Sequence, residues 1–425
     1  MPTSRRGLLG SALCGTAALA APALVHSQAA AARVLVVGGG FGGATAARYL
    51  RRIAPQLQVT LIEPARRFYT CPFSNLYLAG LRSWESLGHD YDGLRAAGVE
   101  VIHERAEDVD AAARTLRLAG GQRLRWDRLV LSPGIDLRWN ALDGYDEAAA
   151  ELAPHAWKAG AQTLLLRRQM QAMRDGGTFV MVIPDNPFRC PPGPYERAAM
   201  VAHYFKRYKP RSKILLLDAK ENFSKKALFL QGWKALYGEM IEWLGLSRDG
   251  QVVRVDAQAL EVETVFGARH RTDVLNVIPP QKAGFIAERA GVTDASGWAP
   301  VKGENFESQL VAGIHVLGDA SFAGPMPKSG FAANNQGKLA AAAIAAELAG
   351  LEPPTAAYAN TCYSLIGPGY GISVAGVYRA QQGRLIDVPH SVGISPLDAD
   401  AAFRAAEASH GTAWYAAISA DIWDR

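Results

Sequence analysis

A glycine-rich turn near the start of the chain has the composition of a dinucleotide-binding site. The apolar run at residues 34–37 leads into Gly38, Gly40 and Gly43, and a helical pattern follows. Glycines let the backbone approach a pyrophosphate, which the N-terminus of the helix then binds. Glu63 ends the next apolar run, twenty residues after Gly43, where an acid accepts hydrogen bonds from both hydroxyls of an adenosine ribose. Together these residues predict a site for FAD or NAD rather than NADP.

A second segment, far along the chain, narrows this prediction to FAD. Residues 313–320 read GIHVLGDA, a predicted strand that ends in Gly318 and Asp319. In flavoproteins with two dinucleotide-binding domains, this acid binds the ribityl chain of FAD. The helix predicted at residues 330–349 should point its positive end at the flavin pyrimidine ring, where it stabilises the charge of the reduced flavin. Lys328, just before this helix, either adds to that positive charge or is an exposed lysine without a role in the site.

A second nucleotide-binding unit lacks the turn that NAD(P)H needs. A strand at residues 178–183 opens this unit, a helix follows at residues 195–208, and the next strand ends in Asp218. Between the first strand and the helix the sequence is PDNPFRCPPGPYER, which is rich in proline and has a single glycine. Proline has no N–H to donate to a phosphate, and the bulky side chains would block a pyrophosphate. The sequence therefore predicts a retained fold without a nicotinamide site, which argues against NAD(P)H as the reductant.

The N-terminal residues 1–31 have the features of an export signal. The twin arginines Arg5 and Arg6 stand before a mildly apolar, Ala-rich segment that Pro22 ends, and small residues follow as cleavage sites. The twin-arginine route carries proteins already folded around a cofactor, which suits a flavoprotein. The alternative is a membrane anchor, which needs about 20 strongly apolar residues, and this segment is barely long enough and weakly apolar. The prediction is a cleaved leader and a periplasmic protein.

Export makes the cysteines informative. Cys14 leaves with the leader, and Cys71, Cys190 and Cys362 remain. In an oxidising compartment an odd number of thiols needs an explanation, because one disulfide leaves one thiol over.

The composition is that of a globular protein with two or three lobes. The chain has 425 residues, of which 49% are hydrophobic and 20% charged. The net charge of +5 comes without a Lys/Arg cluster interleaved with aromatic residues, which argues against a nucleic-acid partner. No segment after the leader has a transmembrane pattern, so no stable membrane insertion is predicted. Three histidines lack metal-ligand spacing, and no metal is predicted: His103, His203 and His390.

The elements that must position these residues form an α/β fold. An FAD-binding domain is predicted in two parts, at residues 32–148 and 270–352. Between them lies a second Rossmann-like domain with a degenerate NAD site, at residues 149–269. The strand predicted at 274–280 should return the chain to the first domain, and residues 353–425 should form a C-terminal interface domain.

Several segments resemble the flavin subunit of flavocytochrome c sulfide dehydrogenase, a relative of the sulfide:quinone oxidoreductases. The resemblance covers essentially the whole mature chain and rests on FYTCPFSN, PHAWKAG, FRCPPGPYER, VIPPQKAG, GDAS, PMPKSGFAANNQGK, NTCYS and YGISVAG. The cysteine-containing segments are highly specific, whereas the glycine turn is shared with hundreds of unrelated enzymes. The resemblance implies two Rossmann-like dinucleotide-binding domains of the glutathione-reductase type and a C-terminal interface domain.

The resemblance also implies a role for each of the three thiols. A cysteine in the position of Cys71 attaches FAD covalently through the 8α-methyl carbon, and cysteines matching Cys190 and Cys362 form a redox-active disulfide beside the flavin. The residues support this in part, because Cys190 lies in the loop that replaces the nicotinamide site. The alternatives are a structural disulfide between domains and a buried free thiol at Cys71.

The implied reaction is the oxidation of sulfide to zero-valent sulfur or a polysulfide. Hydrosulfide attacks the disulfide, which gives a persulfide on one cysteine and a thiolate on the other. The electrons reach the flavin as a pair and leave it singly. Glu196 is a candidate acid or base for the sulfide. Its alternative role is to stabilise its helix, because a carboxylate in the first turn interacts favourably with the helix dipole. Trp414 either packs on the flavin or belongs to the core of the interface domain.

The electron acceptor must be a separate molecule. The chain has no Cys-x-x-Cys-His, so no c-type haem is predicted on it, and the resemblance implies a separate cytochrome c subunit. The alternatives are an accessory flavoprotein that reactivates a sulfur-carrier protein, a sulfide:quinone oxidoreductase and an NADH-dependent reductase. The final helix, predicted at residues 398–424, is acidic rather than basic, unlike a helix that binds a membrane surface.

Overall fold

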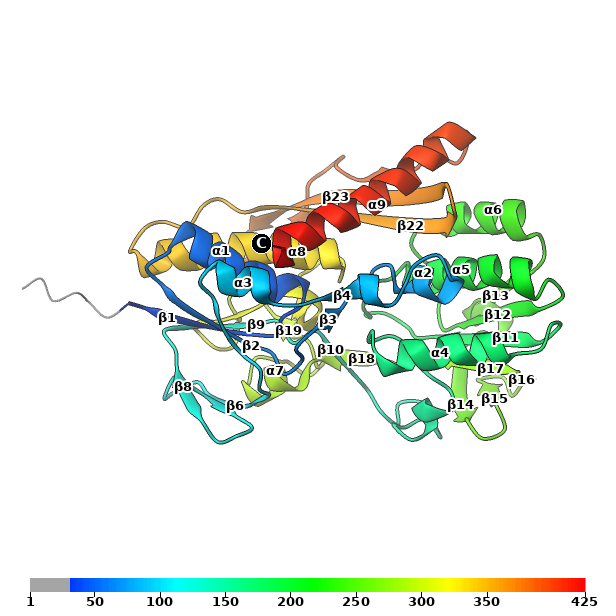
Figure 1. Cartoon of the computed structure of the whole chain (residues 1–425), viewed down its shortest axis with the longest axis horizontal. Coiled ribbons are helices and arrows are strands. Elements are labelled where there is room, and N and C mark those ends of the chain that lie inside the picture. The colour runs from blue at the N-terminus through cyan, green and yellow to red at the C-terminus, as the bar shows by residue number, and fades with distance from the viewer. Residues whose placement is uncertain (1–30, 425) are drawn as a thin grey trace, which may run out of the picture. The chain divides into compact units, whose positions relative to one another are not determined.

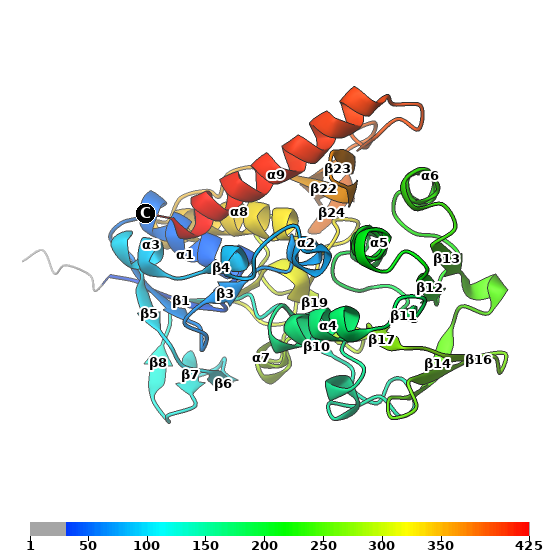
Figure 2. The same cartoon turned by 45° about the vertical axis from the view of Figure 1, so that its right-hand side comes forward.

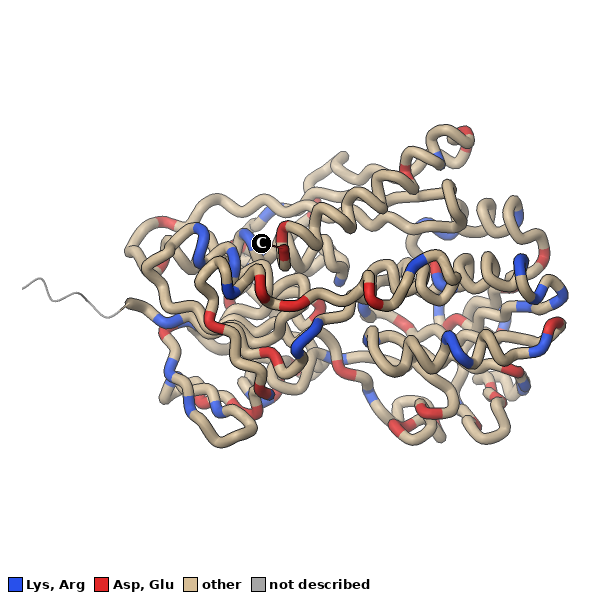
Figure 3. The backbone as a smooth tube through the Cα atoms, in the orientation of Figure 1, with Lys and Arg blue, Asp and Glu red and all other residues tan. Residues whose placement is uncertain are grey.

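The computed structural model of the chain describes residues 31–424. The twin arginines and Cys14 of the predicted signal peptide lie outside these residues, so that peptide stays a prediction. The residues from Ala32 onward form one unit. Charged residues of both signs are spread along its helices and loops (Figure 3).

The first sheet is parallel and joins strands from both ends of the chain. Its order is β20-β9-β1-β2-β5, so β20 lies next to β9 although about 180 residues separate them. Helices α1 and α8 pack against each other over this sheet (Figure 1). Their bounds are β1 Arg33–Val37, β2 Gln58–Ile62, β5 Glu100–Ile102, β9 Arg128–Leu131, β20 Ile314–Val316, α1 Phe41–Ile53 and α8 Gly330–Leu348. Strands covered on both faces read as continuous apolar runs, as those of β1 and β9 do.

The second sheet is also parallel, with the order β13-β12-β11-β17. Helix α5 follows β11, and α6 follows β12, as in a Rossmann unit. The bounds are β11 Thr178–Ile183, β12 Lys213–Asp218, β13 Ile241–Leu244, β17 Val274–Val277, α4 Ala161–Ala172, α5 Gly193–Tyr208 and α6 Lys226–Tyr237. The predicted α/β class with two Rossmann-like sheets is confirmed.

One predicted boundary is displaced. The strand at residues 274–277 was expected to belong to the first domain, but β17 pairs with β11 and completes the second sheet. Its four residues are all buried there, and Pro279 and Pro280 follow, which have no N–H to donate to the sheet. The chain crosses back after β17, at β18 (Gln281–Ala283), which pairs antiparallel with β10 (Ile135–Leu137).

The C-terminal part is an antiparallel sheet covered by a long helix. Strand β23 pairs with β22, β24 and β25. Helix α9 packs on β22 and β23, and its last turns reach α1 and α3, as Figures 1 and 2 show. The bounds are β22 Ala357–Gly367, β23 Tyr370–Gln381, β24 Arg384–Asp387, β25 Gly393–Ile394 and α9 Ala401–Trp423.

Shorter elements fill the connections between these layers. They are β3 Phe68–Tyr69, β4 Gly88–His89, β6 Ala106–Asp110, β7 Thr115–Leu118, β8 Arg123–Arg125, β14 Val252–Asp256, β15 Glu261–Thr264, β16 Arg269–Arg271, β19 Ala299–Pro300, β21 Ser321–Phe322, α2 Ser74–Ala79, α3 Asp92–Ala96 and α7 Phe285–Arg289. Within residues 31–424, none of the helices has both the length and the hydropathy of a membrane span.

Candidate functional site

One cavity of about 540 Å³ connects the glycine turn with all three thiols. Its walls come from the first sheet, from the loop before α5 and from β22 of the C-terminal sheet. Most of the predicted site residues line it: Gly38, Gly40, Glu63, Cys71, Cys190, Glu196, Asp319, Cys362 and Trp414. Gly43 and Lys328 are not among its lining residues. The fold therefore brings the predicted cofactor-binding turn and the predicted redox groups to one place.

The glycine turn leaves the N-terminus of α1 open to the cavity. Gly38 has a φ of +100°, and a Cβ there would lie 2.3 Å from the carbonyl oxygen of Ser132. A Cβ on Gly43 would lie 2.0 Å from the carbonyl oxygen of Gly38, so Gly43 serves the close packing of helix and turn. Gly40 precedes α1, and no side chain caps the helix. The first N–H groups of α1 are thus available to an anionic phosphate.

Glu63 is held at the carboxyl end of β2 by two backbone N–H groups. Gly39 N donates to Oε2 and Ala65 N donates to Oε1, each at 2.9 Å. A carboxylate has about four acceptor positions, so two remain for ribose hydroxyls. The turn, the uncapped helix and this oriented acid fit the adenosine diphosphate half of FAD.

Asp319 faces the cavity in an ion pair that the sequence did not predict. Arg189 Nη1 lies 3.6 Å from Asp319 Oδ2, and the Arg189 guanidinium also donates to the carbonyl oxygen of Trp157. Burial works to lower the pKa of Arg189, but Cys71, Asp319 and Cys190 together raise it above its ordinary value. Arg189 is therefore a fixed positive charge among the groups of the site. Its only sequence signal is its place directly before Cys190.

Lys328 does not point into the cavity. Its Nζ donates to the carbonyl oxygens of Asp319 (2.9 Å) and Ser321 (2.5 Å) and lies 3.9 Å from the centre of the Trp298 ring. Burial lowers the pKa of Lys328 to about 8. The ammonium is hydrogen-bonded to backbone rather than exposed, and its contribution to the positive charge at the flavin stays a prediction. Its own carbonyl oxygen accepts from Cys190 N at 2.9 Å, so Lys328 also holds the cysteine loop.

Cys190 lies in a strained turn at the start of α5. It has a φ of +57°, and its carbonyl oxygen accepts from Gly193 N at 2.8 Å. A Cβ on Gly193 would lie 3.0 Å from Cys190 Sγ, so the sulfur packs against the first turn of the helix. Burial raises the pKa of the Cys190 thiol, and the neighbouring Cys362 and Glu196 raise it further.

Cys362 reaches the same cavity from β22. Asn360 Nδ2 donates to its sulfur at 3.3 Å. Cys71, Cys190 and Cys362 are all free thiols in this structure, so the disulfide between Cys190 and Cys362 stays a prediction.

Glu196 links α5 to β22 at the cavity wall. Its Oε1 accepts from Leu365 N at 3.1 Å, and its Oε2 accepts from Asn75 Nδ2 at 3.4 Å. Burial raises the pKa of Glu196, although the Leu365 N–H and the Lys225 ammonium oppose this. A carboxyl with a raised pKa beside two thiols is suited to proton transfer.

Cys71 and Trp414 occupy the remaining walls. Cys71 precedes α2, and its Sγ donates to the carbonyl oxygen of Trp157 at 3.5 Å. The Trp414 ring stacks on Phe331, with ring centres 6.1 Å apart, and lies near Tyr363. All these aromatic rings line the cavity, which gives the site an apolar wall.

The second nucleotide site is closed by its own side chains. Asp218, the acid at the end of β12, is fully buried. It accepts from Tyr195 Oη at 2.6 Å, from Lys220 Nζ at 2.6 Å and from Trp243 Nε1 at 3.0 Å. Tyr195 stacks on Phe223 with ring centres 3.5 Å apart. The acid that would bind a ribose is therefore engaged by protein groups.

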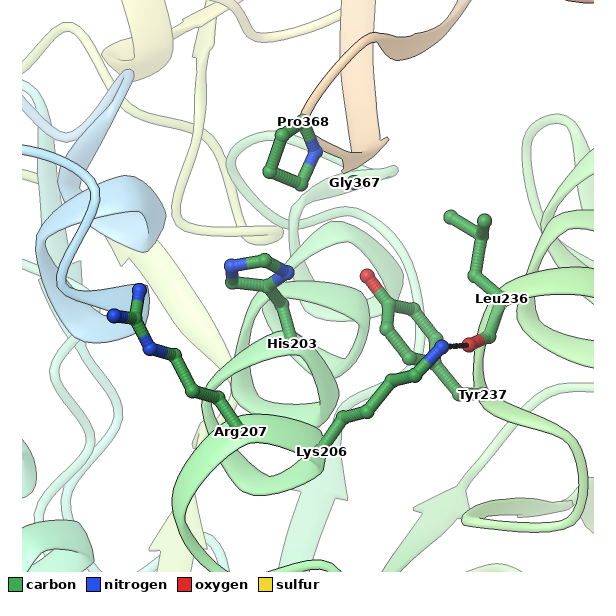
Figure 4. Close-up of a pocket in the computed structure, with 7 residues that line it drawn as sticks. All are labelled: His203, Lys206, Arg207, Leu236, Tyr237, Gly367 and Pro368. Atoms are coloured by element: carbon green, nitrogen blue, oxygen red, sulfur yellow. Dashed lines mark hydrogen bonds between the residues drawn. The ribbon is translucent and has the colours of Figure 1, made fainter.

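A separate cavity of about 260 Å³ lies between the last turns of α5, the end of α6 and the β22–β23 turn (Figure 4). Lys206 Nζ donates there to the carbonyl oxygen of Leu236 at 2.7 Å. Burial lowers the pKa of His203, and Arg207 and Lys206 lower it further. This cavity contains none of the predicted site residues.

Comparison with known proteins identifies the family of the chain. The family model for the central part of the sulfide dehydrogenase [flavocytochrome c] flavoprotein chain matches residues 163–279, and the model for the flavin-binding part of flavocytochrome c sulphide dehydrogenase matches residues 354–423. A pyridine nucleotide-disulphide oxidoreductase model matches residues 32–174. A flavoprotein chain of this sulfide dehydrogenase from Chlorobaculum thiosulfatiphilum is 65% identical over 43 residues, which are 90% of that sequence and 10% of this chain. The chain belongs to the flavocytochrome c sulfide dehydrogenase flavoprotein family.

This flavoprotein family is related to the sulfide:quinone oxidoreductases, and the chain shares their fold. The mitochondrial sulfide:quinone oxidoreductase of Mus musculus is 24% identical over 310 residues, which are 68% of this chain and 65% of that protein. The sulfide:quinone oxidoreductase of Aquifex aeolicus superposes with a TM-score of 0.70 at 18% identity over 93% of both chains. The predicted family resemblance and fold class are confirmed.

Proposed function

We propose that the chain is the flavin subunit of a periplasmic sulfide dehydrogenase that passes electrons to a cytochrome c subunit. Its substrate is sulfide, and its product is zero-valent sulfur or a polysulfide. The observation that carries the proposal is that Cys190 and Cys362 line one cavity with the FAD-type turn. The closed second site supports it, because a reductant other than NAD(P)H must then supply the electrons.

The residues present fit FAD, and each has a definite task. The N-terminus of α1 and Glu63 would hold the adenosine diphosphate, and Asp319 would accept a hydrogen bond from the ribityl chain. The N-terminus of α8 borders the same cavity through Gly330 and Phe331. The Cys71 thiol is the proposed covalent tether. Bound FAD supplies an acceptor for one electron pair at a time.

The disulfide chemistry follows from the surroundings of the two thiols. Hydrosulfide bonds to the sulfur of Cys190, the bond between Cys190 and Cys362 breaks, and its electron pair leaves on the Cys362 sulfur. Cys190 then carries a persulfide and Cys362 a thiolate. This direction is favoured because Asn360 Nδ2 donates to the Cys362 sulfur at 3.3 Å, which stabilises negative charge on that sulfur as it leaves. Glu196 accepts the proton released by the sulfide.

The test is sulfide-dependent reduction of cytochrome c. Purified protein with bound flavin and its cytochrome partner should reduce haem when sulfide is added, and Cys190→Ser and Cys362→Ser should not. NADH should leave the flavin oxidised. A wild-type flavin that sulfide fails to bleach would refute the proposal.

Export is proposed from the twin arginines alone. Replacing Arg5 and Arg6 by lysine should leave the protein in the cytoplasmic fraction, whereas the wild type should appear in the periplasmic fraction. Equal distribution of both would remove the periplasmic assignment.

A second candidate is a sulfide:quinone oxidoreductase. The identity to the mouse enzyme over 310 residues favours it. The two candidates share the sulfide chemistry and differ in the electron acceptor.

A further inference from the structure

Lys225 places a buried ammonium directly behind Cys362. The residue precedes α6, has a φ of 62° and is 5% exposed. Its Nζ donates to the carbonyl oxygen of Cys362 at 2.7 Å and to Ser364 Oγ at 2.9 Å. Both acceptors are neutral, and a buried charge is costly unless a charge of opposite sign lies nearby.

The charges that compensate Lys225 are those of the redox site. Burial lowers the pKa of Lys225, whereas Cys362, Glu196 and Cys190 raise it. Glu196 Oε1 accepts from Leu365 N, in the same strand as Cys362. Negative charge on the Cys362 sulfur would therefore compensate the buried positive charge of the Lys225 ammonium.

Asn360 lies two residues before Cys362 in β22, and its side chain also contacts Cys362. Ser329 Oγ accepts from Ala332 N at 3.0 Å and donates to Asn360 Oδ1 at 2.6 Å. This fixes the orientation of the amide, whose Nδ2 donates to Cys362 Sγ at 3.3 Å. Asn360 is 3% exposed, so its donor has little access to water.

We propose that Lys225 and Asn360 are positioning residues that stabilise the Cys362 thiolate released when the disulfide with Cys190 opens, an inference that rests on the proposed function. Hydrosulfide forms a bond to Cys190 Sγ, the disulfide bond breaks, and the electron pair goes to Cys362 Sγ. The Asn360 N–H contacts that sulfur, and the Lys225 ammonium supplies the opposite charge from behind. Burial, Cys362 and Glu196 disfavour charge on Cys190, and Arg189 opposes them only in part.

The test measures thiolate reactivity rather than sulfide turnover. The dithiol form of the flavin-loaded protein is alkylated with iodoacetamide at pH 7, and the rates at Cys362 and Cys190 are followed by peptide mass. Lys225→Met should slow alkylation of Cys362 about tenfold relative to Cys190. Loss of the ammonium removes the charge that stabilises the thiolate, which should lower the thiolate fraction of Cys362 about tenfold. Lys225→Arg should keep the rate within about threefold, because the charge is retained.

The neighbouring lysine provides the matched control. Lys226 Nζ donates to the carbonyl oxygen of Glu221 and lies over the Trp243 ring, away from the thiols. Lys226→Met should leave the Cys362 rate unchanged. The proposal fails if Lys225→Met reacts like the wild type, or if Lys225→Arg is as slow as Lys225→Met.

Asn360→Ala tests the proposed role of the Asn360 side chain. It also keeps the proposal testable if Lys225→Met does not fold. Loss of one hydrogen bond to the sulfur should slow alkylation of Cys362 about fivefold. An unchanged rate in a variant with full flavin content refutes the proposal. Alkylation needs neither sulfide nor cytochrome, so a wild type with a reactive Cys362 that fails to oxidise sulfide would refute only the proposed function.

Discussion

At the scale of single residues, Cys71 is the proposed covalent tether of the flavin. Its half-buried thiol lines the same cavity as the glycine turn, and Asp319 and Arg189 lie nearby. If it is the tether, flavin should stay with acid-precipitated wild-type protein and wash away from Cys71→Ser. Cys190→Ser is the matched control and should retain its flavin. Flavin released from the wild type would remove the covalent assignment without affecting the sulfide chemistry.

Glu196 gives the second prediction at this scale, through its pH dependence. Burial raises the pKa of Glu196, so the carboxylate needed to accept a proton is lost as pH falls, at a higher pH than for an ordinary glutamate. The rate of sulfide-dependent flavin reduction should therefore decrease as the pH falls. In Glu196→Gln this rate should be lower by about 100-fold or more, and its decrease at acid pH should be absent. Stopped-flow bleaching of the flavin across pH measures both. Glu288→Gln, at an exposed position of α7, should match the wild type, and a wild-type profile in Glu196→Gln would leave only the helix-dipole role.

At the scale of elements, the second Rossmann unit keeps its strands, and protein groups engage the acid at the end of β12. Asp218→Asn should lower the free energy of unfolding by about 3 kcal/mol, because it leaves Lys220 buried without its charge partner. Urea denaturation measures this. Asp175→Asn removes an exposed pair with Arg211 and should leave the midpoint unchanged. An equally small effect at Asp218 would mean that the closed site contributes nothing to stability.

The elements also show where prediction from sequence succeeds and where it stops. The apolar runs of β1 and β11 and the long helix α8 were predicted closely, since burial on both faces and helical periodicity leave a local signature. Strand β17 was placed in the wrong domain, because an apolar run does not specify its sheet. Arg189 and Lys225 were missed, since a charged residue that is buried looks the same in sequence as an exposed one.

At the scale of the whole molecule, the site exists only because three parts of the chain meet. The first sheet supplies the glycine turn, the second supplies the loop with Cys190, and the C-terminal sheet supplies Cys362. Helix α9 buries Ile418, Ile422 and Trp423 against this assembly. The Trp423 ring stacks 5.4 Å from that of Phe68, so the end of the chain is packed onto the FAD half. The proposed electron path from the two thiols to the flavin therefore lies within one cavity.

The electron acceptor is the property of the whole molecule that separates the two candidate functions. The flavocytochrome c models match the segments that carry Cys190 and Cys362, at 163–279 and 354–423. We therefore expect flavin reduced by sulfide to be reoxidised at least about tenfold faster by the partner cytochrome c than by a soluble quinone, a difference of about 1.4 kcal/mol in barrier. Double-mixing stopped flow on one preparation measures both rates under identical conditions. The Cys362→Ser variant, reduced photochemically instead of by sulfide, is the control and should keep the same acceptor preference, because the disulfide acts before the flavin. A faster reaction with quinone would assign the chain to the sulfide:quinone oxidoreductases while leaving the thiol chemistry intact.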